Sequence, residues 1–272
     1  MNRTSPRFPC LPSRDYAARG SARLHVVYPA REHSWYGTEV DRMHLPKHLP
    51  TGTSLPGTSL LLASDFAGHS YGHYLLASLP WMHLFLAAGF TLDAVDHVLC
   101  HQPPSAEAEL HFSRLGVPPE KCIWLAKEAA WRPERLLAPS FPGTKANYPS
   151  WVAAFLKQAF APAPTTAHRR LWIGRRGLRR NITNADDVDR MMQEHGFEAY
   201  NVAAATNPAD DFAEASMVVS PHAGSLADLA FCNPGTKVLE LLPTDHTAPY
   251  YYMLSLAAGL EYRCLVCRSL HE

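Results

Sequence analysis

The C-terminal third of the chain alternates apolar runs of strand length with helical runs, and this alternation constrains the fold more than any other feature. Strands are predicted at 171–174, 197–202, 217–220, 237–242 and 262–266, and helices at 184–195, 208–215 and 249–259. Strands that are joined through helices run parallel in one sheet, and the helices pack on its faces. The sequence therefore predicts an α/β fold with a parallel sheet covered on both faces.

The N-terminal half alternates less regularly, yet its predicted strands and helices have similar lengths. The segment 71–89 has an apolar helical pattern that Pro80 interrupts, because proline inside a helix removes a hydrogen bond and clashes with the preceding turn. Strands are predicted at 24–28, 59–63, 95–100 and 122–125, and further helices at 105–115 and 148–161. We therefore expect a second α/β unit in this half.

The segment APAPTTAH, residues 161–168, separates the two halves, because proline and small residues continue neither a helix nor a sheet. We expect a loose N-terminal arm over 1–21, an N-terminal α/β domain over 22–160, this linker, and a C-terminal α/β domain over 169–272. The two domains are expected to face one another across a cleft, with the acceptor on the N-terminal side.

Charge and composition bear on the class of partner. Lys+Arg and Asp+Glu are both 25 in this chain of 272 residues, so no global field attracts nucleic acid, and no such partner is expected. No run of about 18 apolar residues predicts a transmembrane helix, although peripheral membrane association stays open. The N-terminus lacks the apolar segment of a secretion signal and the six cysteines are scattered, so we expect a cytoplasmic location.

The stretch 217–242 carries the clearest chemical signal. It predicts a strand, a small-residue turn over 221–225, a helix and a second strand. A helix that begins directly after a strand presents free backbone N–H groups, which suit a phosphate or diphosphate. Glu240 stands near the end of the second strand, where open α/β sheets place groups that contact ligands. The candidate anion-binding residues of the turn are His222, Ala223, Gly224 and Ser225.

Four arginines follow the strand that ends at residue 174. They are Arg175, Arg176, Arg179 and Arg180. Arginine binds phosphate oxygens through paired hydrogen bonds, and the end of a parallel strand points into the ligand crevice. The cluster therefore predicts contact with a phosphate group. A solvated basic turn is the alternative, and an RNA-binding patch that includes Arg169 and Arg170 is another.

Three segments carry a resemblance to a known family. They are SYGHYLLASLP from residue 70, LWIGRRGLRRNITNADDV from residue 171, and SPHAGSLADLAFCNPGTKVLEL from residue 220. They resemble the motifs of glycosyltransferase family 61, especially its bacterial capsular polysaccharide type, and they follow the family's order. The resemblance implies two facing Rossmann-like domains of the GT-B type.

The resemblance also implies the reaction: an inverting transfer of a sugar from a nucleotide-diphosphate donor, expected to be UDP-linked. The acceptor would be a glycan or glycolipid, as in capsule or lipopolysaccharide biosynthesis. Arg175 matches the family's first arginine in this region, and Arg179 or Arg180 matches the second. A carboxylate at Glu240 is suited to accept hydrogen bonds from the ribose hydroxyls of the donor. We expect the nucleotide sugar as substrate, with no cofactor and no metal.

His73 falls on the family's histidine and is the expected general base, since histidine titrates near neutral pH. Asp65 is the nearest carboxylate that can replace it in that role. The chain departs from the family pattern at Ala77 in place of an acidic residue, Trp81 in place of arginine, Ala223 and Ser225 in place of glycine, and Asp228 in place of asparagine.

Other interpretations stay open at this point. The chain could be a non-catalytic relative that binds a nucleotide sugar or a glycan, or a different α/β enzyme that acts on a phosphorylated small molecule. A half-buried structural histidine is the alternative at position 73. Zinc is a minor alternative for the histidine pairs His44/His48, His69/His73 and His97/His101 and for Cys264 with Cys267.

Overall fold

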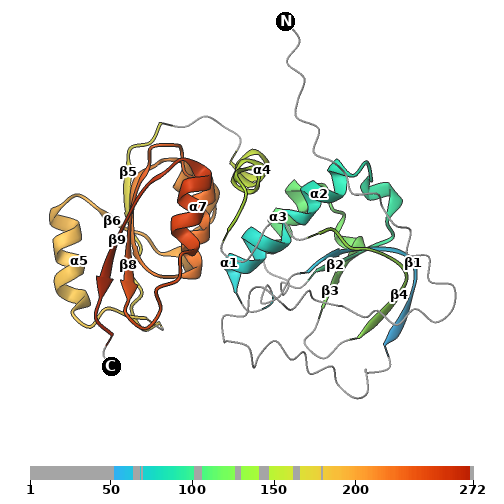
Figure 1. Cartoon of the computed structure of the whole chain (residues 1–272), viewed down its shortest axis with the longest axis horizontal. Coiled ribbons are helices and arrows are strands. Elements are labelled where there is room, and N and C mark those ends of the chain that lie inside the picture. Colours follow the sequence, from blue (N-terminus) through green and yellow to red (C-terminus); the bar gives the residue numbers. More distant parts are fainter. Residues whose placement is uncertain are drawn as a thin grey trace, which may run out of the picture.

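The computed structural model describes residues 52–63, 68, 70–100, 106–125, 130–140, 147–161, 166–178 and 180–269. In these residues the chain forms two sheets with helices between and beside them (Figure 1). The four-stranded sheet has the order β3-β2-β1-β4, and the five-stranded sheet has the order β6-β5-β7-β8-β9. All paired strands are parallel. The predicted α/β class, with parallel sheets flanked by helices, is confirmed.

The four-stranded sheet consists of β1 (Thr53–Leu62), β2 (His97–Cys100), β3 (Cys122–Trp124) and β4 (Trp131–Leu137). β1 starts at Thr53, earlier than the predicted residue 59. The sequence did not predict β4, because three charged residues and Pro133 interrupt its apolar residues. β4 lies at the edge of the sheet, where a proline is tolerated because no second neighbouring strand needs its missing N–H.

The helical segments of the first half lie between β1 and β2 and between β2 and β3. They are α1 (Tyr71–His73), a π-helical turn (Tyr74–Ser78), α2 (Trp81–Ala87) and α3 (Ala106–Arg114), with 3₁₀ turns at Leu92–Ala94 and Pro119–Lys121. The predicted break in segment 71–89 is confirmed, since Pro80 is the N-cap of α2. In the π turn, the Leu79 N–H donates to the Tyr74 carbonyl at 3.1 Å. Such turns are rare and often lie at functional sites.

The five-stranded sheet consists of β5 (Arg169–Trp172), β6 (Glu198–Ala199), β7 (Ala215–Pro221), β8 (Lys237–Pro243) and β9 (Glu261–Cys267). Its helical segments are α5 (Ala185–Glu194), a 3₁₀ turn at Val202–Ala204, α6 (Pro208–Ala213), the 3₁₀ helix η5 (Gly224–Phe231) and α7 (Tyr250–Ala258). α5 covers the outer face, and α7 lies on the face toward the first half (Figure 1). The strand order reverses between β5 and β7, and doubly wound sheets bind ligands at the carboxyl ends of strands at such a point.

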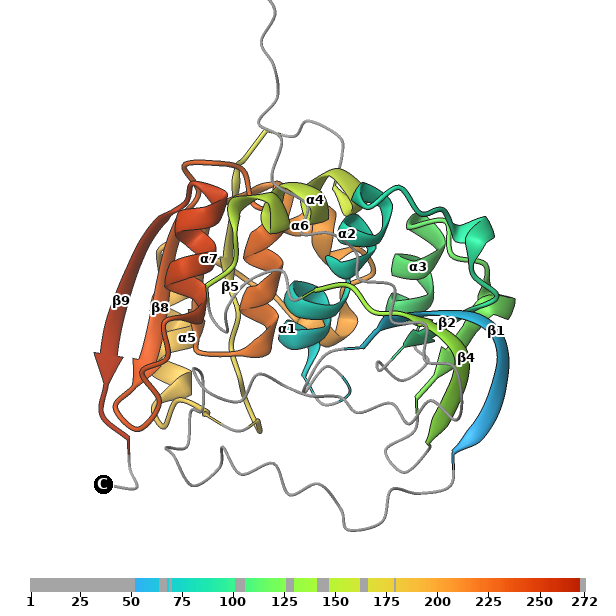
Figure 2. The same ribbon diagram turned by 45° about the vertical axis from the view of Figure 1, so that its right-hand side comes forward.

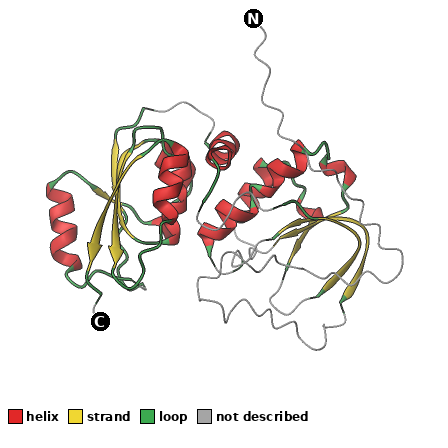
Figure 3. Cartoon of the chain, viewed as in Figure 1, coloured by secondary structure: helices red, strands yellow, loops and turns green. Residues whose placement is uncertain are grey.

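One hydrophobic core joins the two sheets. Its buried residues include Leu60 and Val98 of the first sheet, Phe160 of α4 (Ser150–Phe160), Phe231 of η5 and Leu254 of α7. Figure 3 shows the helices gathered between the sheets, and Figure 2 shows α1 beside the helices of the second half. Residues 1–21, 24–28 and 162–165 lie outside the described residues, so the predicted arm and linker stay predictions, as does the division into two domains.

Candidate functional site

His222 directly follows β7 at the carboxyl end of the second sheet. Its side chain is buried, with 4% of the residue exposed. The His222 N–H donates to the Leu241 carbonyl of β8 at 3.0 Å, and Arg180 Nε donates to the His222 carbonyl at 2.9 Å. Both backbone polar groups of His222 are therefore fixed, one by the sheet and one by the loop after β5.

Glu240 of β8 fixes the His222 ring. β7 and β8 place Ser220 beside Glu240, and Glu240 is fully buried. His222 Nδ1 lies 2.5 Å from Glu240 Oε1, and the Tyr262 hydroxyl donates to Glu240 Oε2 at 2.5 Å. A carboxylate only accepts, so Nδ1 carries the proton and Nε2 is the nitrogen through which His222 can act on a ligand. A ribose contact of Glu240 stays a prediction.

Arg175 and Arg180 lie in the loop after β5, close to this pair. Burial and the positive charge of Arg180 both lower the pKa of the half-buried Arg175. Arg180 has φ 61°, and among the described residues no other non-glycine has a positive φ. Left-handed backbone costs about 1–2 kcal/mol outside glycine, and such strain clusters at functional sites. Two neighbouring guanidinium groups repel each other, and an anion bound between them would relieve that repulsion.

The other arginines of the region have different positions. Arg179 lies outside the described residues. Arg176 Nε donates to Asp189 at 2.8 Å, and its terminal nitrogen pairs with Asp186 at 2.5 Å, so Arg176 is bound to α5. Arg170 stacks on the Phe197 ring at 4.4 Å.

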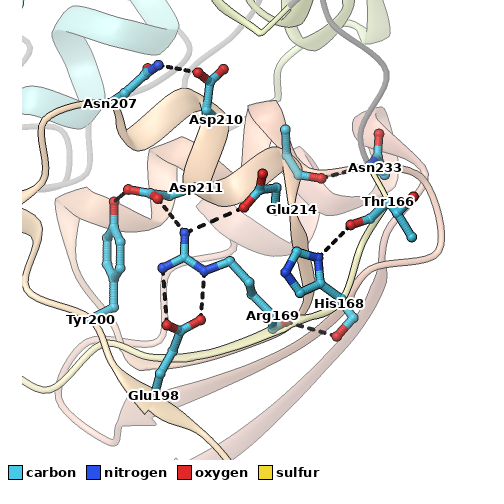
Figure 4. Close-up of polar contacts among 12 residues, drawn as sticks. Thr166, His168, Arg169, Glu198, Tyr200, Asn207, Asp210, Asp211, Glu214 and Asn233 are labelled. Carbon is cyan, nitrogen blue, oxygen red and sulfur yellow. Dashed lines mark hydrogen bonds and ion pairs between the residues drawn. The ribbon is translucent and has the colours of Figure 1, made fainter.

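Arg169 lies in a separate ion-pair network at the opposite, amino end of the strands (Figure 4). Its Nε contacts Glu198 at 2.7 Å, and it also pairs with Asp211 and with Glu214 at 3.9 Å. The Tyr200 hydroxyl donates to Asp211 at 2.8 Å. This network links β5, β6 and α6, and its arginine is already matched by carboxylates. The described arginines of the region therefore do not form one shared surface.

Aromatic rings surround His222 and connect it to the first half. The centroid distances from His222 are 4.8 Å to His246, 5.2 Å to Tyr251 and 6.3 Å to Tyr250. The Tyr250 ring also lies 6.1 Å from His73 of α1. The structure thus brings the predicted base and His222 to the same tyrosine. The sequence did not single out these three aromatic residues, although His246 lies between β8 and α7, and Tyr250 and Tyr251 begin α7.

The predicted anion turn takes a different backbone form from a glycine-rich loop. Ala223 is extended, with φ −155°, and η5 begins at Gly224 as a 3₁₀ helix. Neither Ala223 nor Ser225 has a positive φ, which explains why residues other than glycine fit there. A Cβ on Gly72 would lie 3.4 Å from the Gly224 carbonyl oxygen, so α1 and η5 approach at the backbone.

Asp228 points from η5 toward α1. It is fully buried, and Oδ1 accepts a hydrogen bond from the Tyr71 hydroxyl at 2.6 Å. Oδ2 has no hydrogen-bond partner among the described groups. Burial raises the pKa of Asp228 well above its ordinary value, and the nearby Glu107 raises it further. Burial therefore favours the protonated carboxyl over the carboxylate, while the hydrogen bond from Tyr71 opposes the shift.

Several expectations lie beyond the described residues or leave no trace within them. Asp65, like Arg179, lies outside the described part of the chain, as do His44, His48, His69 and His101. No group of three or more His, Cys, Asp or Glu side chains that could hold a metal occurs among the described residues. None of the described helices is long and apolar enough to cross a membrane.

Comparison with known proteins identifies the family. The model of the family described as Glycosyltransferase 61 matches residues 71–239, well over half of the chain. The match begins at Tyr71 and includes His73, Arg175, Arg180 and His222, and it ends one residue before Glu240. No curated protein matches the chain. The expected glycosyltransferase family is confirmed: this chain belongs to glycosyltransferase family 61.

Proposed function

We propose that this protein is an inverting glycosyltransferase that transfers a sugar from a UDP-linked donor to a hydroxyl of a glycan or glycolipid. The family supports glycosyltransferase activity in general and implies a nucleotide sugar and a glycan acceptor. The observation that carries the proposal is the His222–Glu240 pair beside Arg175 and Arg180 at the carboxyl ends of β5, β7 and β8.

The donor diphosphate is proposed to lie against the start of η5, between the two arginines and His222 Nε2. Arg175 is half-buried next to Arg180, and a diphosphate would relieve the repulsion between the two guanidinium groups. Fixed donors that face a developing negative charge usually provide the largest part of catalysis. Here they would stabilise UDP as it leaves, without a resident metal or cofactor.

The acceptor is proposed to approach from the side of α1. His73, or Asp65 in its place, removes the proton from the acceptor hydroxyl. The acceptor oxygen then forms its bond to the anomeric carbon while the bond from that carbon to the phosphate oxygen breaks, and UDP carries the electron pair away. A single displacement of this kind inverts the anomeric configuration. The contact of His73 and His222 with the same Tyr250 ring supports this division of roles.

The biological setting is proposed on the same basis. Two facing Rossmann-like domains of the GT-B type would place acceptor and donor on opposite sides of a cleft. Capsule or lipopolysaccharide biosynthesis in the cytoplasm, with peripheral membrane association, suits a nucleotide-sugar donor and a glycolipid acceptor.

The test is a panel of UDP-sugars with oligosaccharide acceptors, followed by proton NMR of the product. The expected result is a new glycosidic linkage whose anomeric configuration is opposite to that of the donor. Retention of configuration would contradict the single displacement. A non-catalytic relative is the competing interpretation, favoured by Ala77 and by the buried Trp81 at the family's acidic and arginine positions. UDP binding without turnover of any UDP-sugar would support that interpretation.

A further inference from the structure

The donor chemistry proposed above makes no use of Asp228, although its carboxyl group is fully buried beside the site. Asp228 belongs to η5 of the second half, and its hydrogen-bond partner Tyr71 opens α1 of the first half, 157 residues away in the sequence. Two elements from opposite ends of the family match therefore meet at this contact.

The contact lies next to the predicted base. Gly72 separates Tyr71 from His73, and the missing side chain at Gly72 allows α1 to approach the Gly224 carbonyl. η5 in turn starts directly after the His222 turn. A shift of α1 against η5 would therefore move His73 relative to His222.

We propose that Tyr71 and Asp228 are positioning residues of the transfer reaction, whose hydrogen bond fixes α1 on η5 and so sets His73 against the donor site. The inference rests on the proposed function. It also accounts for the departure from asparagine at position 228, because a protonated carboxyl has nearly the shape of an amide and offers the same oxygen to the Tyr71 hydroxyl.

The surroundings of Asp228 favour the neutral form. The titratable groups that face it are Tyr71 of α1, Glu107 of α3, Tyr200 after β6, Cys232 at the end of η5 and Tyr251 of α7. None of these groups is a cation. An ionised Asp228 would have one donor for two buried oxygens and a second carboxylate nearby, so ionisation favours the separation of α1 from η5.

Kinetics of Tyr71→Phe and Asp228→Asn in the full chain test the inference. Tyr71→Phe is expected to lower kcat about 10-fold or more, as small misplacements of reacting groups do. UDP affinity should change much less than kcat, because His222, Arg175 and Arg180 follow β7 and β5 and take no part in the Tyr71–Asp228 contact. Asp228→Asn is expected to retain the wild-type kcat at neutral pH and to lose less activity than the wild type as pH rises, because only the wild type can ionise at this position. Tyr252→Phe, an exposed tyrosine of α7, is the matched control.

Hydrogen exchange measured at one pH provides a readout that does not depend on turnover. Tyr71→Phe should increase exchange at 70–78 and 224–231 but not in β8, while Asp228→Asn should follow the wild type. Wild-type kcat in Tyr71→Phe, or unchanged hydrogen exchange where α1 contacts η5, would overturn the inference. A wild type that neither binds UDP nor turns over a UDP-sugar would overturn the proposed function instead. Hydrogen exchange would then still decide whether the Tyr71–Asp228 hydrogen bond holds α1 on η5.

Discussion

Two buried carboxyl groups, Glu240 and Asp228, lie on either side of the His222 turn and differ in what surrounds them. Both are fully buried, and both accept a tyrosine hydroxyl, from Tyr262 at 2.5 Å and from Tyr71 at 2.6 Å. The second oxygen of Glu240 meets the His222 imidazole. The second oxygen of Asp228 has no partner among the described groups.

The difference shows how burial can serve two purposes in one site. A buried carboxylate with donors on both oxygens can orient an imidazole, and under the proposed function Glu240 would act through His222 on the donor side. Burial with one donor raises the pKa of Asp228 and favours its neutral form, and under the proposed inference Asp228 would act through Tyr71 on the acceptor side. If the two sides are separable, a substitution on one side should leave the function of the other intact.

The largest effect is expected at His73, which separates catalysis from donor binding. Removal of a general base typically lowers the rate by about 10²–10⁴-fold and leaves substrate binding nearly unchanged. His73→Ala should therefore lose turnover of a UDP-sugar while it still binds UDP. Steady-state kinetics with Asp65→Asn in parallel decides between the two candidate bases. If His73→Ala is fully active and Asp65→Asn is inactive, the carboxylate is the base and the histidine is structural.

The next effect is expected at Glu240, where loss of the carboxylate leaves the buried His222 Nδ1 and the partly buried Tyr262 hydroxyl without an acceptor. Each unsatisfied buried group costs about 1–3 kcal/mol, so Glu240→Leu should lower the free energy of unfolding by about 3 kcal/mol. Glu240→Gln is the matched control, because its amide oxygen can still accept the Nδ1 proton of His222. Urea denaturation measures both. Equal stability of the leucine and glutamine variants would show that the His222 contact contributes nothing.

Per pH unit, the change in stability expected at Asp228 is smaller than the Glu240 effect. The folded-state pKa of Asp228 is raised above the unfolded value, so its contribution to stability is full below the unfolded pKa and is lost as pH rises toward the folded pKa. In that window the wild type should lose up to about 1.4 kcal/mol per pH unit relative to Asp228→Asn. Urea denaturation of both proteins, in steps of about one pH unit from about pH 4 to about pH 8, measures the difference. Parallel curves for the two proteins would contradict a neutral buried carboxyl.

The second sheet was predictable because its central strands are short apolar runs between clear turn signals. β7 and β8 lie within about two residues of their predicted bounds, since Val218, Val219 and Val238 are buried and β-branched. β4 was not predictable, because an edge strand with Pro133 and exposed charges shows no apolar alternation. β6 shrank to Glu198–Ala199 for a related reason: its residues are exposed, and it is an edge strand that pairs only with β5.

Site residues were predictable only where a local pattern marks them. His222 and the arginines stand directly after strands, where spacing alone indicates ligand contact. The partners of those residues come from tertiary structure. Tyr262 reaches Glu240 because β9 pairs Cys264 beside Glu240 and side chains two residues apart share a face. The Tyr71–Asp228 contact joins segments with no common sequence pattern.

The most direct test of the central claim is the thermal shift that UDP produces in wild type, Arg175→Ala and Arg176→Ala. The two arginines are adjacent, but Arg175 lies beside Arg180, whereas the exposed Arg176 is paired with α5. A ligand at 100 times its dissociation constant stabilises a protein by about 2.7 kcal/mol, which raises Tm by several degrees. We predict that UDP raises Tm in wild type and Arg176→Ala and that Arg175→Ala loses most of the shift. No shift with any nucleoside diphosphate, or an equal shift in all three proteins, would contradict a donor site at the carboxyl ends of β5 and β7.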